Sequence, residues 1–234
     1  MKEKNKAIVI SCEHGGNAIP EKYKPLFKKA QSALNSHRGY DLGALDLFKS
    51  IENNYTAHKQ SATTSRLLVD INRSLHRRTL FSEFTIQLSQ HEKTEILDTY
   101  YYSFRKAFEA KIRDLWKQDT TVLHLSVHSF TPVLNGKIRA TDFGILYHPG
   151  RSAEKQFAKI WKAEIAKTLP EFKTRFNYPY SGKPDGHVRY YRDIETQKYL
   201  GIEFEMNQKY AGNYKVILGL TEAFNRASDA WINL

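Results

Sequence analysis

The sequence predicts an α/β fold, a three-layer sandwich in which helices cover a mixed, largely parallel sheet. Two observations carry this prediction. Short apolar runs rich in β-branched residues, such as AIVIS at 7–11, are typical of buried strands. These runs alternate with longer stretches of helical periodicity, as in proteins whose parallel strands are joined by helices.

The predicted elements follow one another along the chain. Strands are expected over residues 7–11, 66–73, 121–130 and 199–207. Helices are expected over residues 19–27, 41–54, 88–117, 152–169 and 216–232. The second helix is expected to begin near Asp41, because a carboxylate suits the first turn of a helix. No repeat or flexible linker interrupts this order, so residues 1–234 are expected to form a single domain.

The charge of the chain raises the question of nucleic-acid binding. The 36 lysines and arginines exceed the 25 acidic residues by 11, an excess that is common in proteins that bind nucleic acids. The lysines are, however, interspersed with acidic residues, which indicates solvated helix faces. Nucleic-acid binding is therefore the less favoured interpretation.

The remaining composition predicts a cytoplasmic protein without a membrane partner. Cys12 is the only cysteine, so an internal disulfide and a zinc site built from cysteines are excluded. No run of about 18 apolar residues predicts a membrane span. The charged N-terminus and the short apolar run that follows it are unlike a signal peptide.

Polar residues follow or end several predicted strands, where parallel strands would bring them to one edge of the sheet. They are Glu13 and His14, Asn72 and Arg73, His128, and Glu203 and Glu205. Gly15 and Gly16 would let the chain turn tightly beside His14 and leave room for an approaching group.

Spacing separates some of these candidates from others. His124 and His128 would lie about 13 Å apart in a strand, too far for one metal ion, so His128 is the better ligand and His124 is expected to be packed. Glu203 and Glu205 lie on the same face of their strand, about 6 to 7 Å apart. One of the two is therefore expected to take the main role at the site.

Two histidines and one carboxylate with an open position are a usual set of ligands for a catalytic zinc ion. His14 and His128 supply the imidazoles, and Asp41 is our choice for the carboxylate, with an ordinary helix cap as its alternative role. Glu13 is a competing ligand, but neighbouring residues point to opposite faces as long as the strand persists, so Glu13 is the poorer choice unless the chain has already turned there. A separate glutamate could act as general base, and Arg73 could hold a substrate carboxylate.

Six motifs occur in order across residues 8–212. They are SCEHGGNAIP, HRGYDLGA, LLVDINRS, SVHSFTP, NYPYSGKPDG and IEFEMNQKY. Together they resemble the N-formylglutamate amidohydrolase family, which is similar in fold to zinc carboxypeptidases and aspartoacylases. The resemblance implies one bound Zn²⁺ with His14 and His128 as ligands, Glu205 as the catalytic glutamate, and Asn72 with Arg73 as the pair that holds a substrate carboxylate. Arg66 resembles an accessory arginine of that pair.

The chain departs from the patterns of its relatives in two places. The carboxypeptidase pattern His-x-x-Glu would put a glutamate at Asn17, so the carboxylate ligand must come from elsewhere, and Asp41 fits by analogy with zinc amidases. EHGG also differs from the PHSG form associated with formylglutamate enzymes. Arg139 is a further candidate for substrate binding, with a surface hairpin as the alternative, and Tyr178 or Tyr180 could supply a hydroxyl from a loop at the rim of the site.

The sequence thus predicts a zinc-dependent hydrolase that cleaves the amide bond of an N-acyl amino acid, with N-formyl-L-glutamate as the first candidate. A peptide or peptidoglycan amidase with the same zinc chemistry is one alternative, and a basic nucleic-acid-binding module without catalysis is another. The expected partner is a small molecule, and the oligomeric state is not predicted. No role is expected for His37, His58, His76, His91, His148 and His187.

Overall fold

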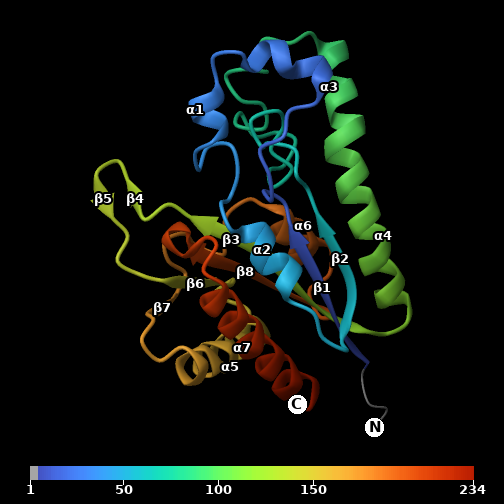
Figure 1. Cartoon of the computed structure of the whole chain (residues 1–234). Helices are drawn as coiled ribbons and strands as arrows, with labels where there is room; N and C mark the ends of the chain where they lie inside the picture. The colour runs from blue at the N-terminus through green and yellow to red at the C-terminus, as the bar shows by residue number, and fades with distance from the viewer. Residues whose placement is uncertain (1–4) are drawn as a thin grey trace.

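The computed structural model describes residues 5–234, and a six-stranded sheet runs through it in the order β2-β1-β3-β8-β6-β7 (Figure 1). Its strands are β1 (Lys6–Cys12), β2 (Thr56–Ser61), β3 (Thr121–Phe130), β6 (Phe143–Leu146), β7 (Thr174–Phe176) and β8 (Tyr199–Asn207). Four pairs of neighbours are parallel, and β6 runs antiparallel to β8. The predicted mixed, largely parallel sheet is confirmed.

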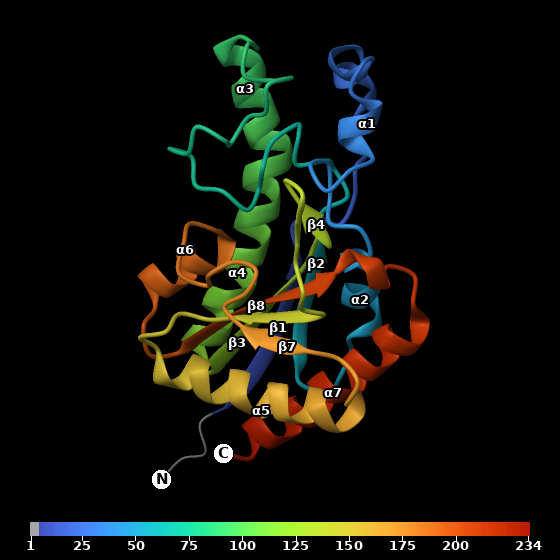
Figure 2. The same ribbon diagram turned by 90° about the vertical axis from the view of Figure 1, so that its left-hand side faces the viewer.

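Helices cover both faces of this sheet, as the sequence predicted. The helical segments are η1 (Glu21–Phe27), α1 (Gln31–Leu34), α2 (Ala44–Ser50), α3 (Gln90–Ile96), η2 (Leu97–Tyr102), α4 (Ser103–Lys117), α5 (Ser152–Thr168), α6 (His187–Ile194), η3 (Gln208–Tyr210) and α7 (Tyr214–Ile232). Helices α2, α5 and α7 pack on one face, and α4 and α6 pack on the other (Figure 2). No helix among residues 5–234 is long and apolar enough to cross a membrane.

Because side chains alternate along the strands, one face of the sheet carries apolar side chains and the other carries many polar ones. On β1, Ile8 and Ile10 pack with α2 and α7, whereas Val9 packs with α4. The same period of two puts a row of polar residues of β1, β3 and β8 on the face of α4 and α6, and Glu13, directly after β1, continues this row. These residues are Ser11, Glu13, His124, Ser126, His128, Glu203 and Glu205. One face of the sheet is therefore apolar, and the other holds the polar residues from which a site can be built.

The strand predicted over residues 66–73 is wrong, because this segment forms turns. Its apolar side chains are buried outside the sheet, in a second cluster that includes Tyr23, Phe27 and Ile96. The parallel edge strand is instead β2, whose sequence TAHKQS is polar and lies at the edge of the sheet. Burial of an apolar run does not require a strand, and an edge strand does not require an apolar run.

Several boundaries also differ from the predicted ones. The helix predicted over 88–117 runs from Gln90 to Lys117 as α3, the π-helical segment η2 and α4. The helix predicted over 19–27 is the 3-10 helix η1, and the one predicted from Asp41 begins at Ala44. Strands β6 and β7 and helix α6 were not predicted. A hairpin of β4 (Val133–Leu134) and β5 (Lys137–Ile138) extends away from the sheet (Figure 1).

Candidate metal centre and active site

A cavity of about 290 Å³ opens at the carboxyl ends of β1, β3 and β8. Seven of the eight predicted site residues line it, and the eighth, Arg139, contacts it through Tyr180. The seven are His14, Asp41, Arg66, Asn72, Arg73, His128 and Glu205. The tertiary structure thus brings together residues that are up to 191 positions apart, the separation of 14 from 205.

His14, Asp41 and His128 converge in this cavity. One ligand atom from each lies within 4.8 Å of the others, and all three residues are buried. Asp41 Oδ2 is 2.8 Å from His128 Nδ1 and 3.6 Å from His14 Nδ1. Two imidazole nitrogens and one carboxylate oxygen therefore face the same point.

The chain itself holds Asp41 against His14. The backbone N–H of Asp41 donates to the carbonyl oxygen of His14 over 2.9 Å. The helix α2 that follows is capped by Gly43, so Asp41 does not serve as its N-cap. The glycines after His14 were expected to leave room for a group that approaches His14, but the structure gives Gly16 another role. A Cβ on Gly16 would lie 2.4 Å from the carbonyl oxygen of Thr63, so this glycine makes room for the chain rather than for a ligand.

Asp70 orients the imidazole of His14. His14 Nε2 lies 2.7 Å from Asp70 Oδ1, which leaves Nδ1 facing Asp41. Burial, with a contribution from Arg66, lowers the pKa of His14 to about 4, so the ring is neutral at pH 7. Burial alone would raise the pKa of Asp70, but His14 and Arg66 lower it below its usual range. A neutral imidazole whose other nitrogen is bonded to a carboxylate is the usual form of a metal-binding histidine.

These donors fit a metal ion. His14 Nδ1 is buried and has no hydrogen-bond partner among the described residues. A buried nitrogen without a partner is costly, and a cation between His14, Asp41 and His128 would satisfy it. Two nitrogens and one oxygen are a donor set that Zn²⁺ commonly takes. The carboxylate of Glu13, the competing ligand, is grouped with His124 and His187 instead.

Glu205 stands next to this group on β8. It is the Cα partner of His128 in the parallel register of β3 and β8, and its Oε2 is buried without a hydrogen-bond partner among the described residues. Burial raises the pKa of Glu205 to about 7, although His128 acts to lower it. Glu203 also lines the cavity, beside Ser126, and burial raises its pKa as well. A carboxyl group that titrates near neutrality can both take up and release a proton.

The arginines of the cavity differ in how far they are already engaged. Arg66 donates to Asp41 Oδ1, and its Nε is buried without a partner among the described residues. Arg73 makes long bonds of 3.3 and 3.4 Å to backbone oxygens and lies 3.8 Å from Asp70, so its guanidinium can be drawn to a new anion. Arg139 follows the hairpin and donates to the Tyr180 hydroxyl at the rim.

Residues 6–211 match the N-formylglutamate amidohydrolase family. The chain belongs to this family. It is therefore a hydrolase that acts on an amide bond. No curated protein matches the chain significantly.

Two solved structures share the fold of this amidohydrolase. One is a gene product of Agrobacterium tumefaciens, 22% identical over 96% of this chain and 91% of that one, with a TM-score of 0.79. The other is an N-formylglutamate amidohydrolase from Ralstonia eutropha, 14% identical over 98% of this chain and 95% of that one, with a TM-score of 0.74. At these identities the likeness concerns the fold.

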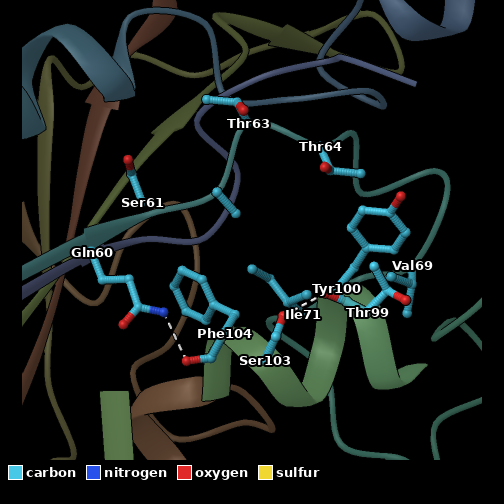
Figure 3. A pocket seen from close by; sticks show the side chains of 11 residues that line it. Gln60, Ser61, Thr63, Thr64, Val69, Ile71, Thr99, Tyr100, Ser103 and Phe104 are labelled. Atoms are coloured by element: carbon cyan, nitrogen blue, oxygen red, sulfur yellow. Dashed lines mark hydrogen bonds between the residues drawn. The ribbon is translucent and has the colours of Figure 1, made fainter. Parts of the chain in front are cut away.

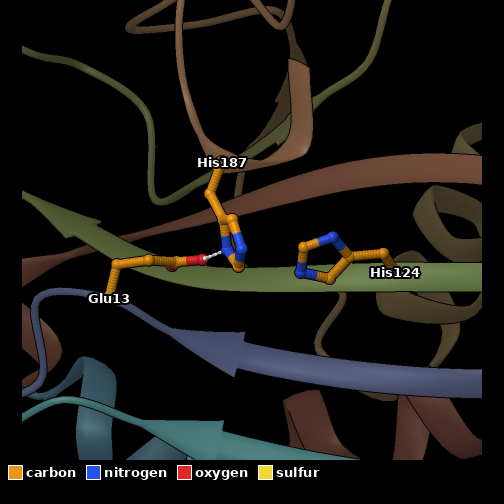
Figure 4. A group of neighbouring side chains, drawn as sticks. All are labelled: Glu13, His124 and His187. Atoms are coloured by element: carbon orange, nitrogen blue, oxygen red, sulfur yellow. Dashed lines mark hydrogen bonds and ion pairs between the residues drawn. The ribbon is translucent and has the colours of Figure 1, made fainter. Parts of the chain in front are cut away.

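A second group of ligand-type residues lies deeper in the amidohydrolase. Glu13, His124 and His187 are buried, and His187 points its ring at the Glu13 carboxylate (Figure 4). Both nitrogens of each ring already have partners. His124 contacts Ser11 and Tyr199, and His187 contacts Glu13 and Tyr191. A metal here would have to displace these bonds, so this group is a hydrogen-bonded network.

Sequence reasoning missed three residues of this region: Asp70, Asp185 and His187. Asp185 accepts from Ser74 and Arg77 and so holds the turn that carries Arg73. A signal was present for Asp70, since a charged residue inside the apolar run LLVDI needs a partner when it is buried. No comparable local signal marks His187, because its partner Glu13 is 174 residues away.

Another cavity of about 330 Å³ lies between the end of β2 and the start of α4 (Figure 3). It is lined by Gln60, Ser61, Ala62, Thr63, Thr64, Val69, Ile71, Thr99, Tyr100, Ser103 and Phe104. Gln60 is engaged there in a bond to the carbonyl oxygen of Phe104 over 2.7 Å. The residues that line this cavity include no histidine, carboxylate or arginine, whereas the cavity with His14 and His128 holds all three.

Proposed function

We propose that this amidohydrolase is a zinc enzyme that cleaves the amide bond of an N-acyl amino acid, with N-formyl-L-glutamate as the leading substrate. The observation that carries the proposal is the convergence of His14, Asp41 and His128 in one cavity with Glu205 and Arg73. The family to which the chain belongs supports the same substrate.

His14, Asp41 and His128 would hold one Zn²⁺ ion. His14 Nδ1 has no hydrogen-bond partner within residues 5–234, and Asp70 holds the other ring nitrogen; both observations support this assignment. When bound, such an ion polarises the acyl oxygen of the amide and makes attack by water possible near neutral pH. The chain supplies three ligands, which leaves a position open for the substrate.

Glu205 is assigned as the general base. Its Oε2, which has no hydrogen-bond partner in the described part of the chain, and its pKa of about 7 suit a group that removes a proton from the attacking water. The same carboxyl group would then pass this proton to the leaving amine nitrogen. Glu203 lies one strand repeat further from the edge of the sheet, beside Ser126 rather than His128, which supports Glu205 as the acting residue.

Arg73 is assigned as the anchor of the substrate α-carboxylate, with Asn72 beside it. The hydrogen bonds that Arg73 makes to backbone oxygens are long and therefore weak. Its guanidinium can exchange them for a bidentate pair with a carboxylate. Arg66, which also lines the cavity, donates to Asp41, and its Nε has no partner among the residues that the structure describes. Arg139, at the rim with Tyr180, would meet the far end of the substrate, where glutamate carries its second carboxylate.

The size of the cavity favours a small substrate over a polymer. About 290 Å³ lies at the low end of the range of ligand pockets. An acylated amino acid fits this volume better than a peptidoglycan strand.

The test is a hydrolysis assay with the purified, zinc-loaded protein. Formate release from N-formyl-L-glutamate is compared with the hydrolysis of N-formyl amino acids with neutral side chains, N-acetylglutamate and muropeptides. We expect N-formyl-L-glutamate to have the highest kcat/KM and a chelator to abolish turnover. Turnover of muropeptides alone would transfer the function to a peptidoglycan amidase. Full activity after removal of the metal would overturn the zinc mechanism.

A further inference from the structure

The turn that carries Arg73 lies outside the sheet, so the hydrogen bonds of a strand ladder do not fix its backbone. Its N–H groups are bonded to two aspartates instead. The N–H of Asn72 donates to Asp70 Oδ1 over 3.0 Å, and that of Ser74 donates to Asp185 Oδ2 over 3.1 Å. Backbone carbonyl groups away from water need partners as well, so the carbonyl oxygens of this turn must also be accounted for.

Two side chains of the long helix, Tyr101 and Arg105, bond to these carbonyl oxygens. The Tyr101 hydroxyl donates to the carbonyl oxygen of Arg73 over 2.8 Å. Arg105 Nη1 donates to the carbonyl oxygens of Ile71 and Arg73, over 3.2 and 3.3 Å. Both side chains are buried, with 4% of Tyr101 and 7% of Arg105 exposed. The backbone oxygen of the proposed substrate anchor is therefore bonded to two donors from one helix.

The guanidinium of Arg105 is itself fixed by aromatic rings. Its Cζ lies over the rings of Tyr101 and Tyr190, 5.2 and 4.9 Å from their centroids. A guanidinium over an aromatic ring gains cation–π energy, which favours this placement. The Tyr190 hydroxyl in turn donates to Glu109 Oε2 on α4 over 3.0 Å. These contacts between α4 and α6 keep the donor of Arg105 directed at the turn.

Tyr101 faces the turn because the helix contains the π-helical segment η2. Ile96, directly before η2, and Tyr101, within it, are five residues apart and are both buried. Five residues make about 1.4 turns of an α-helix, which would put the two side chains on different faces. The hydrogen bonds of a π-helix close over five residues, and such segments are frequent at functional sites. The wider turn thus buries Tyr101, whereas Tyr100 remains partly exposed.

We propose that Tyr101 and Arg105 are positioning residues for substrate binding, which fix the backbone from which the Arg73 guanidinium enters the cavity. The inference rests on the role of Arg73 proposed above. The Arg73 side chain is 37% exposed and its bonds of 3.3 and 3.4 Å are long, so these bonds hold it weakly. A bidentate pair with a carboxylate requires two aligned bonds, and a displaced backbone would misalign them.

The first measurement is the steady-state kinetics of N-formyl-L-glutamate hydrolysis, with bound zinc. Tyr101→Phe removes one donor and keeps the ring, so KM should rise by about 2- to 10-fold, the scale of one hydrogen bond, while kcat and zinc change little. Arg105→Met should also raise KM, and Arg105→Lys, which keeps one donor, should restore part of the loss. Tyr102→Phe is the matched control. It makes the same change on the next residue, whose ring contacts Lys106, and should leave KM unchanged.

A double variant shows whether Tyr101 acts through Arg73. In the Arg73→Lys background, Tyr101→Phe should raise KM little further, because the aligned pair with the carboxylate is already lost. A bond that served the stability of the fold alone would leave KM unchanged in Tyr101→Phe. Equal factors in both backgrounds would mean that Tyr101 affects the substrate by another route, and would overturn the inference.

The second measurement needs no substrate. Hydrogen–deuterium exchange of the backbone amides of residues 72–74 should be faster in Tyr101→Phe and Arg105→Met than in Tyr102→Phe and the unchanged protein. If Arg105→Met does not fold, Tyr101→Phe decides. Unchanged exchange, or an unchanged KM in Tyr101→Phe where Arg73→Lys raises KM, would overturn the inference and leave the anchor standing. An unchanged KM in Arg73→Lys would overturn the anchor, and the inference with it.

Discussion

His128 and Glu205 lie side by side in the sheet, as Cα partners in the parallel register of β3 and β8. Both side chains reach the same cavity, on the face that packs against α4 and α6. This register puts a carboxyl group, one of whose oxygens has no hydrogen-bond partner among residues 5–234, beside a proposed metal ligand. It also offers a comparison, since Glu203 is two residues back on the same face.

Glu205→Gln should therefore reduce turnover while leaving zinc in place. Glutamine keeps the shape of the side chain but cannot accept a proton, so kcat should fall by about 10²- to 10⁴-fold. Glu203→Gln is the matched control, and its effect should be milder. The measurement is kcat for N-formyl-L-glutamate together with bound zinc. If Glu203→Gln removed activity and Glu205→Gln did not, the base would be Glu203.

The stability of the metal-free protein should depend on pH through Glu205. The pKa of this carboxyl group is about 7 in the folded protein and 4.5 ordinarily, so the folded state binds more protons between these values. Stability therefore falls as the pH rises from about 4.5 to about 7, by up to about 3 kcal/mol. Denaturant unfolding at pH 5 and pH 8, in the presence of a chelator, measures this loss. In Glu205→Gln the loss should be smaller by that amount, and equal slopes in both proteins would contradict the assignment.

Replacing a proposed ligand should remove the metal. His14→Ala and Asp41→Ala each delete one of three converging donor atoms, so bound zinc should fall well below one equivalent. His91→Ala, an exposed histidine on α3, is the control and should keep its zinc. Metal analysis after dialysis gives the result. Stoichiometric zinc in Asp41→Ala would mean that the carboxylate ligand lies elsewhere.

Arg73→Lys should weaken substrate binding without loss of metal. Lysine keeps the positive charge but lacks the planar fork that pairs with a carboxylate, so KM should rise by about tenfold or more. Arg226→Lys, on the exposed side of α7, is the control for the same chemical change. Steady-state kinetics and zinc content distinguish the effects. An unchanged KM would make Arg73 a structural residue that pairs with Asp70.

Breaking the buried ion pair of Glu154 and Arg192 should lower the free energy of unfolding more than breaking an exposed pair. Arg192 Nε donates to Glu154 Oε1 over 2.9 Å, and both side chains are almost fully buried. Glu154→Gln leaves the guanidinium without its counter-charge, which typically costs about 3–5 kcal/mol. Glu222→Gln, which breaks an exposed pair with Arg226, should change stability by less than about 1 kcal/mol. Denaturant unfolding compares the two, and equal losses would argue against this account.

The sequence by itself determined the fold class and most of the residues of the candidate site. Buried strands such as 121–130 show their apolar runs locally, and the positions of His14, His128 and Glu205 at strand ends follow from those runs. A period of two along a strand is a local property of the backbone, so it can be read without knowing the partners.

Only the tertiary structure decided which polar groups meet and in which direction their bonds run. The segment 66–73 is as apolar as a strand, but it packs in a second cluster, because burial of apolar surface has no direction and does not select a backbone conformation. The partners of His14 and Glu13, namely Asp70 and His187, lie 56 and 174 residues away. A hydrogen bond depends on distance and direction in space, and chain folding alone brings such distant donors and acceptors together.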